Sequence, residues 1–185
     1  MFTQATHAIS DKGGGRRLGA PTYELNLSGH INDDIRAYCR DFITGPLVSR
    51  GGISRGTQYR AETVASELLL NIAMHSKGGD GAPIAAPEGV VRVTLNGDQL
   101  WIETKAPVTP GDFVEITNTV KTYQGLTFEE RRKKERELML APPAKSQGMG
   151  LGLLAVVSDA REVSVTQSGG VEADGRINCH IRALV

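Results

Sequence analysis

Hydrophobic and polar positions alternate in three stretches of the chain, and this pattern predicts half-buried β-strands. Every second residue is apolar over residues 23–27, which indicates a first strand. Two alternating segments within residues 89–106 flank Asn96-Gly97, a dipeptide typical of tight hairpin turns. Residues 162–184 form a second predicted hairpin. The side chains expected to face inward there are Val163, Val165, Ile177, Cys179 and Ile181.

Other stretches repeat their apolar residues at helical spacing. Asn32 is a predicted N-cap, and the helix that follows is expected to stop at Gly45. A longer helix is predicted over residues 57–76. Thr127 and Glu130 fit a capping box at the start of a highly charged helix.

The order of these elements predicts the fold class. Residues 148–160 indicate a glycine loop running into an apolar helix, whereas residues 107–125 have no clear pattern. Adjacent hairpins with helices between them indicate an α+β two-layer sandwich, with helices on one face of a mostly antiparallel mixed sheet. Residues 1–20 are polar and glycine-rich and are expected to be a flexible tail, followed by a single domain over residues 21–185.

Composition excludes several classes of protein. The 185 residues include 21 basic and 21 acidic side chains, so no net field favours nucleic acid or an anionic membrane. No apolar stretch approaches the roughly 20 residues of a membrane-spanning helix, and the N-terminus has no secretory signal. Cys39 and Cys179 lie on apolar stripes and are expected in the core. Two cysteines do not make a disulfide framework, so a reducing, cytoplasmic setting is expected.

Three polar residues interrupt the predicted helix over residues 57–76. Glu67, Asn71 and His75 follow one another at four-residue spacing, which places them in a gently slanting line about 12 Å long. Because a buried carboxylate without a partner is unfavourable, something polar must face this line. One interpretation is a salt bridge from Glu67 to a basic residue such as Arg92. The other is the polar wall of a ligand pocket, in which the Asn71 amide oxygen suits Mg²⁺.

The sequence "SQGMGLGLL" places Gly148, Gly150 and Gly152 at the start of an apolar helix. Glycines allow close approach of the backbone, and a helix N-terminus offers unpaired N–H groups to an anion. The pattern alone is compatible with a phosphate site or with a tight turn and close helix packing. It is not a Walker loop, because Gly-Lys-Ser/Thr is absent.

Taken in order, the Glu-x3-Asn-x3-His helix and the Gly-x-Gly-x-Gly loop resemble the GHKL ATP-binding fold of gyrase, heat-shock-90, histidine kinases and MutL. The stripe resembles the N box of that superfamily, and "GMGLGLL" resembles its second glycine box. Within the superfamily the chain is most similar to the anti-sigma-factor-kinase branch, and there to SiaB-type protein kinases. Members are thought to phosphorylate a serine or threonine of a small partner protein in partner-switching systems.

The resemblance implies a role for each matching residue. Glu67 takes the catalytic position and Asn71 the magnesium position. The expected nucleotide-binding residues are Asn71, His75, Glu103, Lys145, Gly148, Gly150 and Gly152, with ATP and Mg²⁺ as cofactors.

The chain departs from the superfamily at the first glycine box, Asp-x-Gly-x-Gly, whose aspartate contacts adenine. The strand at that place brings Glu103 and Thr104, and the nearest glycine–acid pair is Gly111-Asp112, in reversed order. Residues 113–147 would form the lid over the nucleotide, where Lys145 and Gln147 are placed to touch phosphate.

Two functions remain open at this point. The first is a Mg-ATP-dependent serine/threonine protein kinase that switches a small regulatory protein. The second is a non-catalytic GHKL-fold module that sequesters such a protein without nucleotide turnover. Neither involves nucleic acid or a membrane, and a homodimer is compatible with both.

Overall fold

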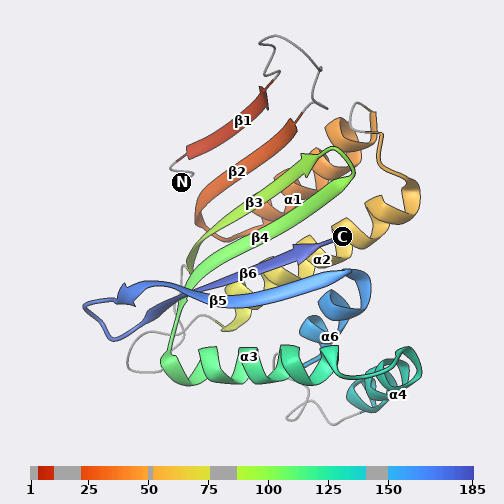
Figure 1. Cartoon of the computed structure of the whole chain (residues 1–185). Helices are drawn as coiled ribbons and strands as arrows, with labels where there is room; N and C mark the ends of the chain where they lie inside the picture. The colour runs from red at the N-terminus through yellow and green to blue at the C-terminus, as the bar shows by residue number, and fades with distance from the viewer. Residues whose placement is uncertain (1–3, 11–21, 50–51, 76–86, 141–149) are drawn as a thin grey trace.

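The fold is described from a computed structural model, which covers residues 4–10, 22–49, 52–75, 87–140 and 150–185. Six strands form one sheet in the order β1-β2-β3-β4-β6-β5 (Figure 1). The strands are β1 (Gln4–Ser10), β2 (Thr22–His30), β3 (Glu88–Asn96), β4 (Gln99–Val108), β5 (Glu162–Val171) and β6 (Ile177–Leu184). The helices are α1 (Asp33–Phe42), α2 (Arg55–His75), α3 (Pro110–Gln124), α4 (Phe128–Met139) and α6 (Gly150–Asp159), with a π-helical segment at Ile43–Leu47.

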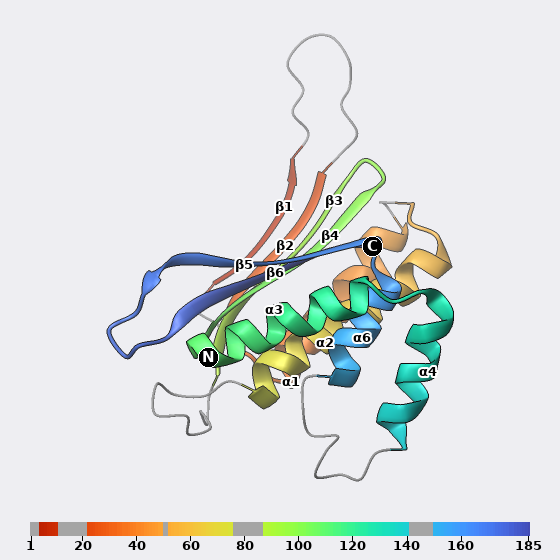
Figure 2. The same cartoon turned by 60° about the horizontal axis from the view of Figure 1, so that its bottom comes forward.

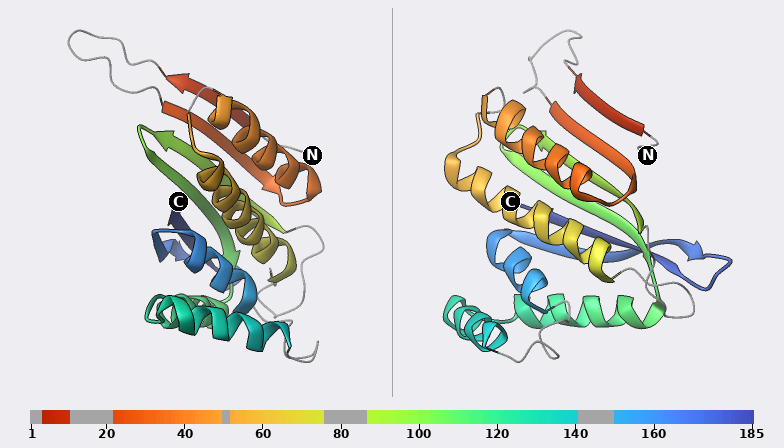
Figure 3. Two further views of the ribbon diagram at one scale, coloured as in Figure 1. Left: turned by 90° about the vertical axis from the view of Figure 1, so that its right-hand side faces the viewer. Right: turned by 180° about the vertical axis from the view of Figure 1, so that it is seen from behind.

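Helices cover one face of the sheet and leave the other face open (Figure 3). The predicted α+β two-layer fold is therefore confirmed. Every strand pairing is antiparallel, so the sheet is not mixed within the described residues. The long helix α2 packs on the centre of the sheet and against α6, and α3 lies along the sheet edge beneath β5 and β6 (Figure 2).

Because side chains alternate along a strand, every second side chain points towards the helices. One cross-strand row of buried apolar residues crosses five of the six strands, from β2 to the edge strand β5. Its members, taken from neighbouring strands, are Leu25, Val93, Ile102, Ala183 and Val163. Because apolar burial is the main favourable term in folding, this row fixes the face on which the helices pack.

The predicted hairpin over residues 89–106 is confirmed. Asn96 pairs with Gln99, which leaves Gly97 and Asp98 as the two-residue turn. Gly97 has φ of +62°, a conformation that glycine adopts without steric cost. The register places Ile102 and Thr104 of β4 on the helix-covered face, below α2.

Caps at helix starts follow the sequence closely. The Asn32 side chain accepts a hydrogen bond from the Ile35 backbone N–H, at 3.1 Å. The capping box of Thr127 and Glu130 is complete. These bonds satisfy N–H groups that would otherwise lack partners in the first turn, and both predicted caps are confirmed.

The structure differs from the sequence-based expectations in three places. Residues 4–10, expected within a flexible tail, form β1 and pair with β2. The first helix does not stop at Gly45, because the chain continues through the π-helical segment that contains Pro46. The region 107–125, which had no clear pattern, contains α3, whose start is capped by the Thr109 side chain.

Candidate functional site

The candidate site begins with two polar residues on α2. Glu67 and Asn71 are half-buried at the border of the core. The neighbouring face of the helix is buried against the sheet and the other helices, as the sequence predicts. That face comprises Ala61, Ala65, Leu68 and Ile72. The helix is therefore apolar towards the sheet and polar along one edge.

Gly152 brings α6 against this polar edge. A Cβ atom at Gly152 would lie 2.6 Å from Glu67 Oε2 and 3.4 Å from Asn71 Oδ1. The first of these distances is shorter than any normal contact, so a side chain at Gly152 would displace the carboxylate. The structure thus brings Glu67, Asn71 and Gly152 together, although Asn71 and Gly152 are 81 positions apart along the chain.

The start of α6 is held by two further helices. A Cβ atom at Gly150 would lie 3.3 Å from the Tyr123 hydroxyl oxygen of α3 and 3.6 Å from Leu138 Cδ2 of α4. Gly150 is the first residue of α6 in the described part of the chain, and the first N–H groups of a helix lack intrahelical acceptors. The edge that carries Glu67 and Asn71 therefore meets a helix N-terminus.

The polar groups of this edge are incompletely satisfied. No hydrogen bond or ion pair joins Glu67 to another described residue, and burial raises the pKa of its carboxyl. The Asn71 side-chain nitrogen, Nδ2, is buried without a hydrogen-bond partner among the described residues. Because buried polar atoms are usually paired, Asn71 is the feature of this region that most needs an additional polar group.

A small cavity lies beside Asn71. Its polar lining consists of Asn71, Thr104 and Asp112, and the remaining wall is apolar. Thr104 comes from β4 and is 3% exposed. Asp112 accepts a hydrogen bond from the Thr109 hydroxyl at 2.8 Å. The cavity has a volume of about 30 Å³, which is the space of about one water molecule.

These features fit the two ends of Mg-ATP unequally. The unpaired Asn71 amide and the glycine contact at Gly152 fit a phosphate–magnesium group, since Mg²⁺ binds through few protein oxygens together with phosphates and waters. A nucleoside needs far more room than 30 Å³, because ligand pockets measure roughly 300–1,000 Å³. The cavity beside Asn71 is therefore too small for the nucleoside end of ATP.

Glu103 does not join this site. Its side chain projects from the open face of β4, on the opposite side of the sheet from α2, and it forms ion pairs with His180 (3.7 Å) and Arg182. Arg182 Nε contacts the carboxylate as an ion pair without the direction of a hydrogen bond, and its guanidinium lies over the Trp101 ring. Strand alternation places Thr104, not Glu103, beside Asn71.

The alternative partner for Glu67 is also on the wrong face. Arg92 lies 3.3 Å from Glu24 of the neighbouring strand, on the open side of the sheet. The interpretation of Glu67 as one half of a salt bridge with Arg92 is therefore wrong.

Four of the positions expected at the nucleotide lie wholly or partly outside the described residues. Lys145 and Gly148 lie outside the described residues, as does Gln147. His75 is the last residue of α2, and its side chain also lies outside the described part.

Arg131 is a residue that sequence reasoning missed. From α4 it donates hydrogen bonds to the carbonyl oxygens of Tyr123 (3.1 Å) and Val157 (3.1 Å), and a longer one to Gln124 (3.5 Å). The first and third acceptors end α3, and the second is in α6. One guanidinium thus ties α4 to α3 and to α6, the helix that contains Gly150. The surrounding charged run gives no signal that singles this arginine out.

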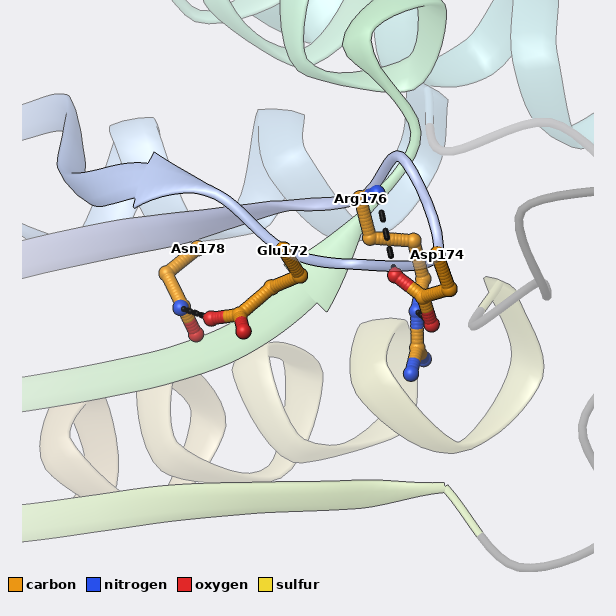
Figure 4. Close-up of polar contacts among 4 residues, drawn as sticks. All are labelled: Glu172, Asp174, Arg176 and Asn178. Atoms are coloured by element: carbon orange, nitrogen blue, oxygen red, sulfur yellow. Dashed lines mark hydrogen bonds and ion pairs between the residues drawn. The ribbon is translucent and has the colours of Figure 1, made fainter.

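A larger cavity lies elsewhere in the described part of the chain. It measures about 600 Å³ and lies between the ends of β2 and β3 and the tip of the β5–β6 hairpin. Arg176 bonds to Asp174 at 2.6 Å, and Asn178 bonds to Glu172 at 2.6 Å (Figure 4). These charged and polar groups satisfy one another, so this cavity has less need of a ligand than the edge at Asn71.

Comparison with known proteins gives one structural match of interest. The sequence matches no protein-family model and no curated protein at a significant level. The fold is similar to a chain in the crystal structure of the SiaB–SiaC complex from Pseudomonas aeruginosa. The TM-score is 0.70 and the sequence identity 16%, over 87% of this chain and 89% of the other. At this identity the likeness shows a shared fold.

Among the described helices, none is both long enough and apolar enough to cross a bilayer.

Proposed function

We propose that the chain is a Mg-ATP-dependent regulator that phosphorylates, and thereby switches, a small partner protein on serine or threonine. The observation that carries the proposal is the convergence of Glu67, Asn71 and Gly152, with the buried Asn71 Nδ2 lacking a partner. The fold shared with a chain of the SiaB–SiaC complex supports a partner protein, because that structure contains two proteins bound to each other.

Each residue has a distinct role in this proposal. Bound Mg-ATP would supply the phosphoryl group and a cation that neutralises its charge. Asn71 would hold the cation through its amide oxygen, and the N–H groups at the start of α6 would hold phosphate oxygens.

Glu67 would orient the partner's hydroxyl and accept its proton. Burial raises the pKa of this carboxyl, which makes its carboxylate a better proton acceptor than that of an ordinary glutamate. No described residue competes for this carboxylate, which leaves it available to a hydroxyl donor.

The small cavity favours a second candidate function. A cavity of about 30 Å³ without an Asp-x-Gly-x-Gly box suits a module that binds a regulatory protein and no nucleotide. The unpaired Asn71 amide has no role in that alternative.

Calorimetric titration with ATP and Mg²⁺ separates the two candidates. The kinase proposal expects binding that depends on Mg²⁺, with this dependence lost in Asn71→Ala. Asn178→Ala, at the hairpin tip, is the matched control and should bind as the parent does. Absence of heat and of a thermal shift at millimolar nucleotide would reject the kinase and leave the sequestering module.

A further inference from the structure

A groove on the outer surface of the helical layer ends at Glu67. It lies between α2, α4 and α6 and measures about 440 Å³. Its lining includes Glu67 but not Asn71, whereas the small cavity beside Asn71 does not include Glu67. The two spaces therefore meet the same helical edge at two residues a single turn apart, the groove at Glu67 and the cavity at Asn71.

Large exposed apolar side chains border this groove. Tyr59 comes from α2, Phe128 and Met139 from the two ends of α4, and Leu151 from the first turn of α6. Tyr59 and Phe128 are 72% and 68% exposed. Apolar side chains of this size, gathered in one place, are typical of protein interaction sites.

The charges of the groove nearly cancel. Glu67, Glu135 and Asp159 contribute carboxylates, whereas Arg131 and Arg132 contribute guanidinium groups. Burial raises the pKa of Asp159, and the positive charge of the nearby Arg60 opposes that shift.

Two of the arginines are engaged within the chain. Arg131 is hydrogen-bonded to backbone carbonyls, and Arg132 lies over the Phe128 ring at 5.8 Å. A surface of this kind does not attract a polyanion or a strongly charged peptide. At its end, however, lies the half-buried Glu67 carboxylate, which accepts no hydrogen bond from a described residue and can take one from a bound donor.

We propose that this groove docks an uncharged, apolar segment of a partner protein and directs a serine or threonine hydroxyl of that segment to Glu67. Apolar side chains of the segment pack between Tyr59, Phe128 and Met139, and the hydroxyl donates its hydrogen to the Glu67 carboxylate. The assignment of this groove as the partner's binding site rests on the proposed function. In that function, phosphate binds at Asn71, on the same edge of α2 as Glu67.

The test uses synthetic ten-residue peptides with a central serine, flanked by apolar, acidic or basic residues. Binding is followed on the intact chain by the NMR signals of the Met139 methyl group and the Leu151 backbone amide. We expect the apolar peptides to shift both signals and the same peptides with alanine in place of serine to bind more weakly. Tyr59→Ala should weaken binding by roughly tenfold.

Tyr38→Ala is the matched control, since Tyr38 is an exposed helical tyrosine on α1, at 55% exposure. Peptides that bind both tyrosine variants equally, that prefer charged flanks, or that leave Met139 and Leu151 unshifted would overturn the docking proposal. Self-association of the chain that perturbs the same signals would assign the groove to a second copy and overturn it as well.

The outcome is separable from nucleotide binding. Peptide binding without Mg-ATP binding would retain the docking groove and reject the kinase. Mg-ATP binding without peptide binding would retain the nucleotide site and reject the docking groove.

Discussion

Glu67 and Glu103 are both shielded glutamates that sequence reasoning assigns to one site, yet the fold puts them on opposite faces of the sheet. Glu103 pairs with His180 and Arg182, whereas Glu67 has no described partner and packs against Gly152. A paired carboxylate contributes to stability, and an unpaired one costs stability unless a ligand engages it. The comparison shows that partners, and not shielding alone, separate a structural acid from a candidate catalytic one.

The largest expected effect is on phosphoryl transfer. Glu67→Gln should lower transfer to the partner by about 10²–10⁴-fold, because the proton acceptor is lost, while Mg-ATP binding is retained. Glu103→Gln should leave transfer within about twofold of the parent, because Glu103 lies on the opposite face of the sheet from the site. The two variants are compared by their rates of phosphoryl transfer to the purified partner and by their Mg-ATP affinity, measured by calorimetry. Full activity of Glu67→Gln would remove Glu67 from the mechanism.

Gly152→Ala tests the glycine contact with Glu67. The added methyl group would meet Glu67 Oε2, and the carboxylate at the end of a flexible side chain would move away. Misplacement of a catalytic group by about 1 Å can lower transfer about a hundredfold. Stability should change little, because alanine favours a helix by about 1 kcal/mol over glycine and offsets the crowding.

Gly111→Ala is the helical control for that substitution. A Cβ atom there meets only Thr109 Oγ1, at an ordinary 3.8 Å. Equal activity of the two alanine variants would show that Gly152 does not position Glu67.

Stability should respond to the two glutamates in opposite directions. Glu103→Gln breaks the ion pair with Arg182 and should lower the free energy of unfolding by about 1–2 kcal/mol, since the arginine is partly exposed. Glu67→Gln removes an unpaired carboxylate and should keep or raise stability. Urea denaturation at pH 7 measures both values. A loss of stability in Glu67→Gln that equals the loss in Glu103→Gln would mean that Glu67 has a structural partner.

The smallest expected effect is a pH dependence. Burial raises the pKa of Glu67 above its ordinary value of 4.5, so the folded chain holds this proton more tightly than the unfolded chain. The carboxylate therefore destabilises the fold at pH above the raised pKa, and this penalty disappears as pH falls towards 4.5.

The stability gained by Glu67→Gln should accordingly be greatest near pH 7–8 and vanish near pH 4.5, with a size below about 1 kcal/mol because solvent reaches the group. Paired denaturation curves of parent and variant across this range measure it. A gain that grows on acidification would contradict the burial of Glu67.

Local signals account for most of what the sequence predicted correctly. The cap at Asn32, the capping box at Thr127 and the turn at Gly97 each depend on residues within four positions. The four-residue spacing of Glu67 and Asn71 likewise placed both on one edge of α2. The start of α3 had such a signal too, since Thr109 precedes Pro110 and accepts from Asp112.

The features that sequence reasoning missed depend on distant contacts. Strand β1 is a short segment whose place is set by pairing with β2. Arg131 acts through carbonyl groups up to 26 residues away. The side of the sheet that Glu103 faces depends on register, and a shift of one residue reverses it. For that reason Thr104, and not its neighbour Glu103, lines the cavity beside Asn71.

The most direct test of the site is a ¹H–¹⁵N NMR titration of the chain with Mg-ATP. The side-chain amide of Asn71 and the backbone amide of Gly152 lie at the site, and the indole N–H of Trp101, the single tryptophan, lies on the open face beside Arg182. We expect the Asn71 and Gly152 signals to shift with Mg-ATP while the Trp101 signal stays unchanged. A shift at Trp101 with Asn71 and Gly152 unmoved, or no shift at millimolar nucleotide, would contradict a nucleotide site at Glu67 and Asn71.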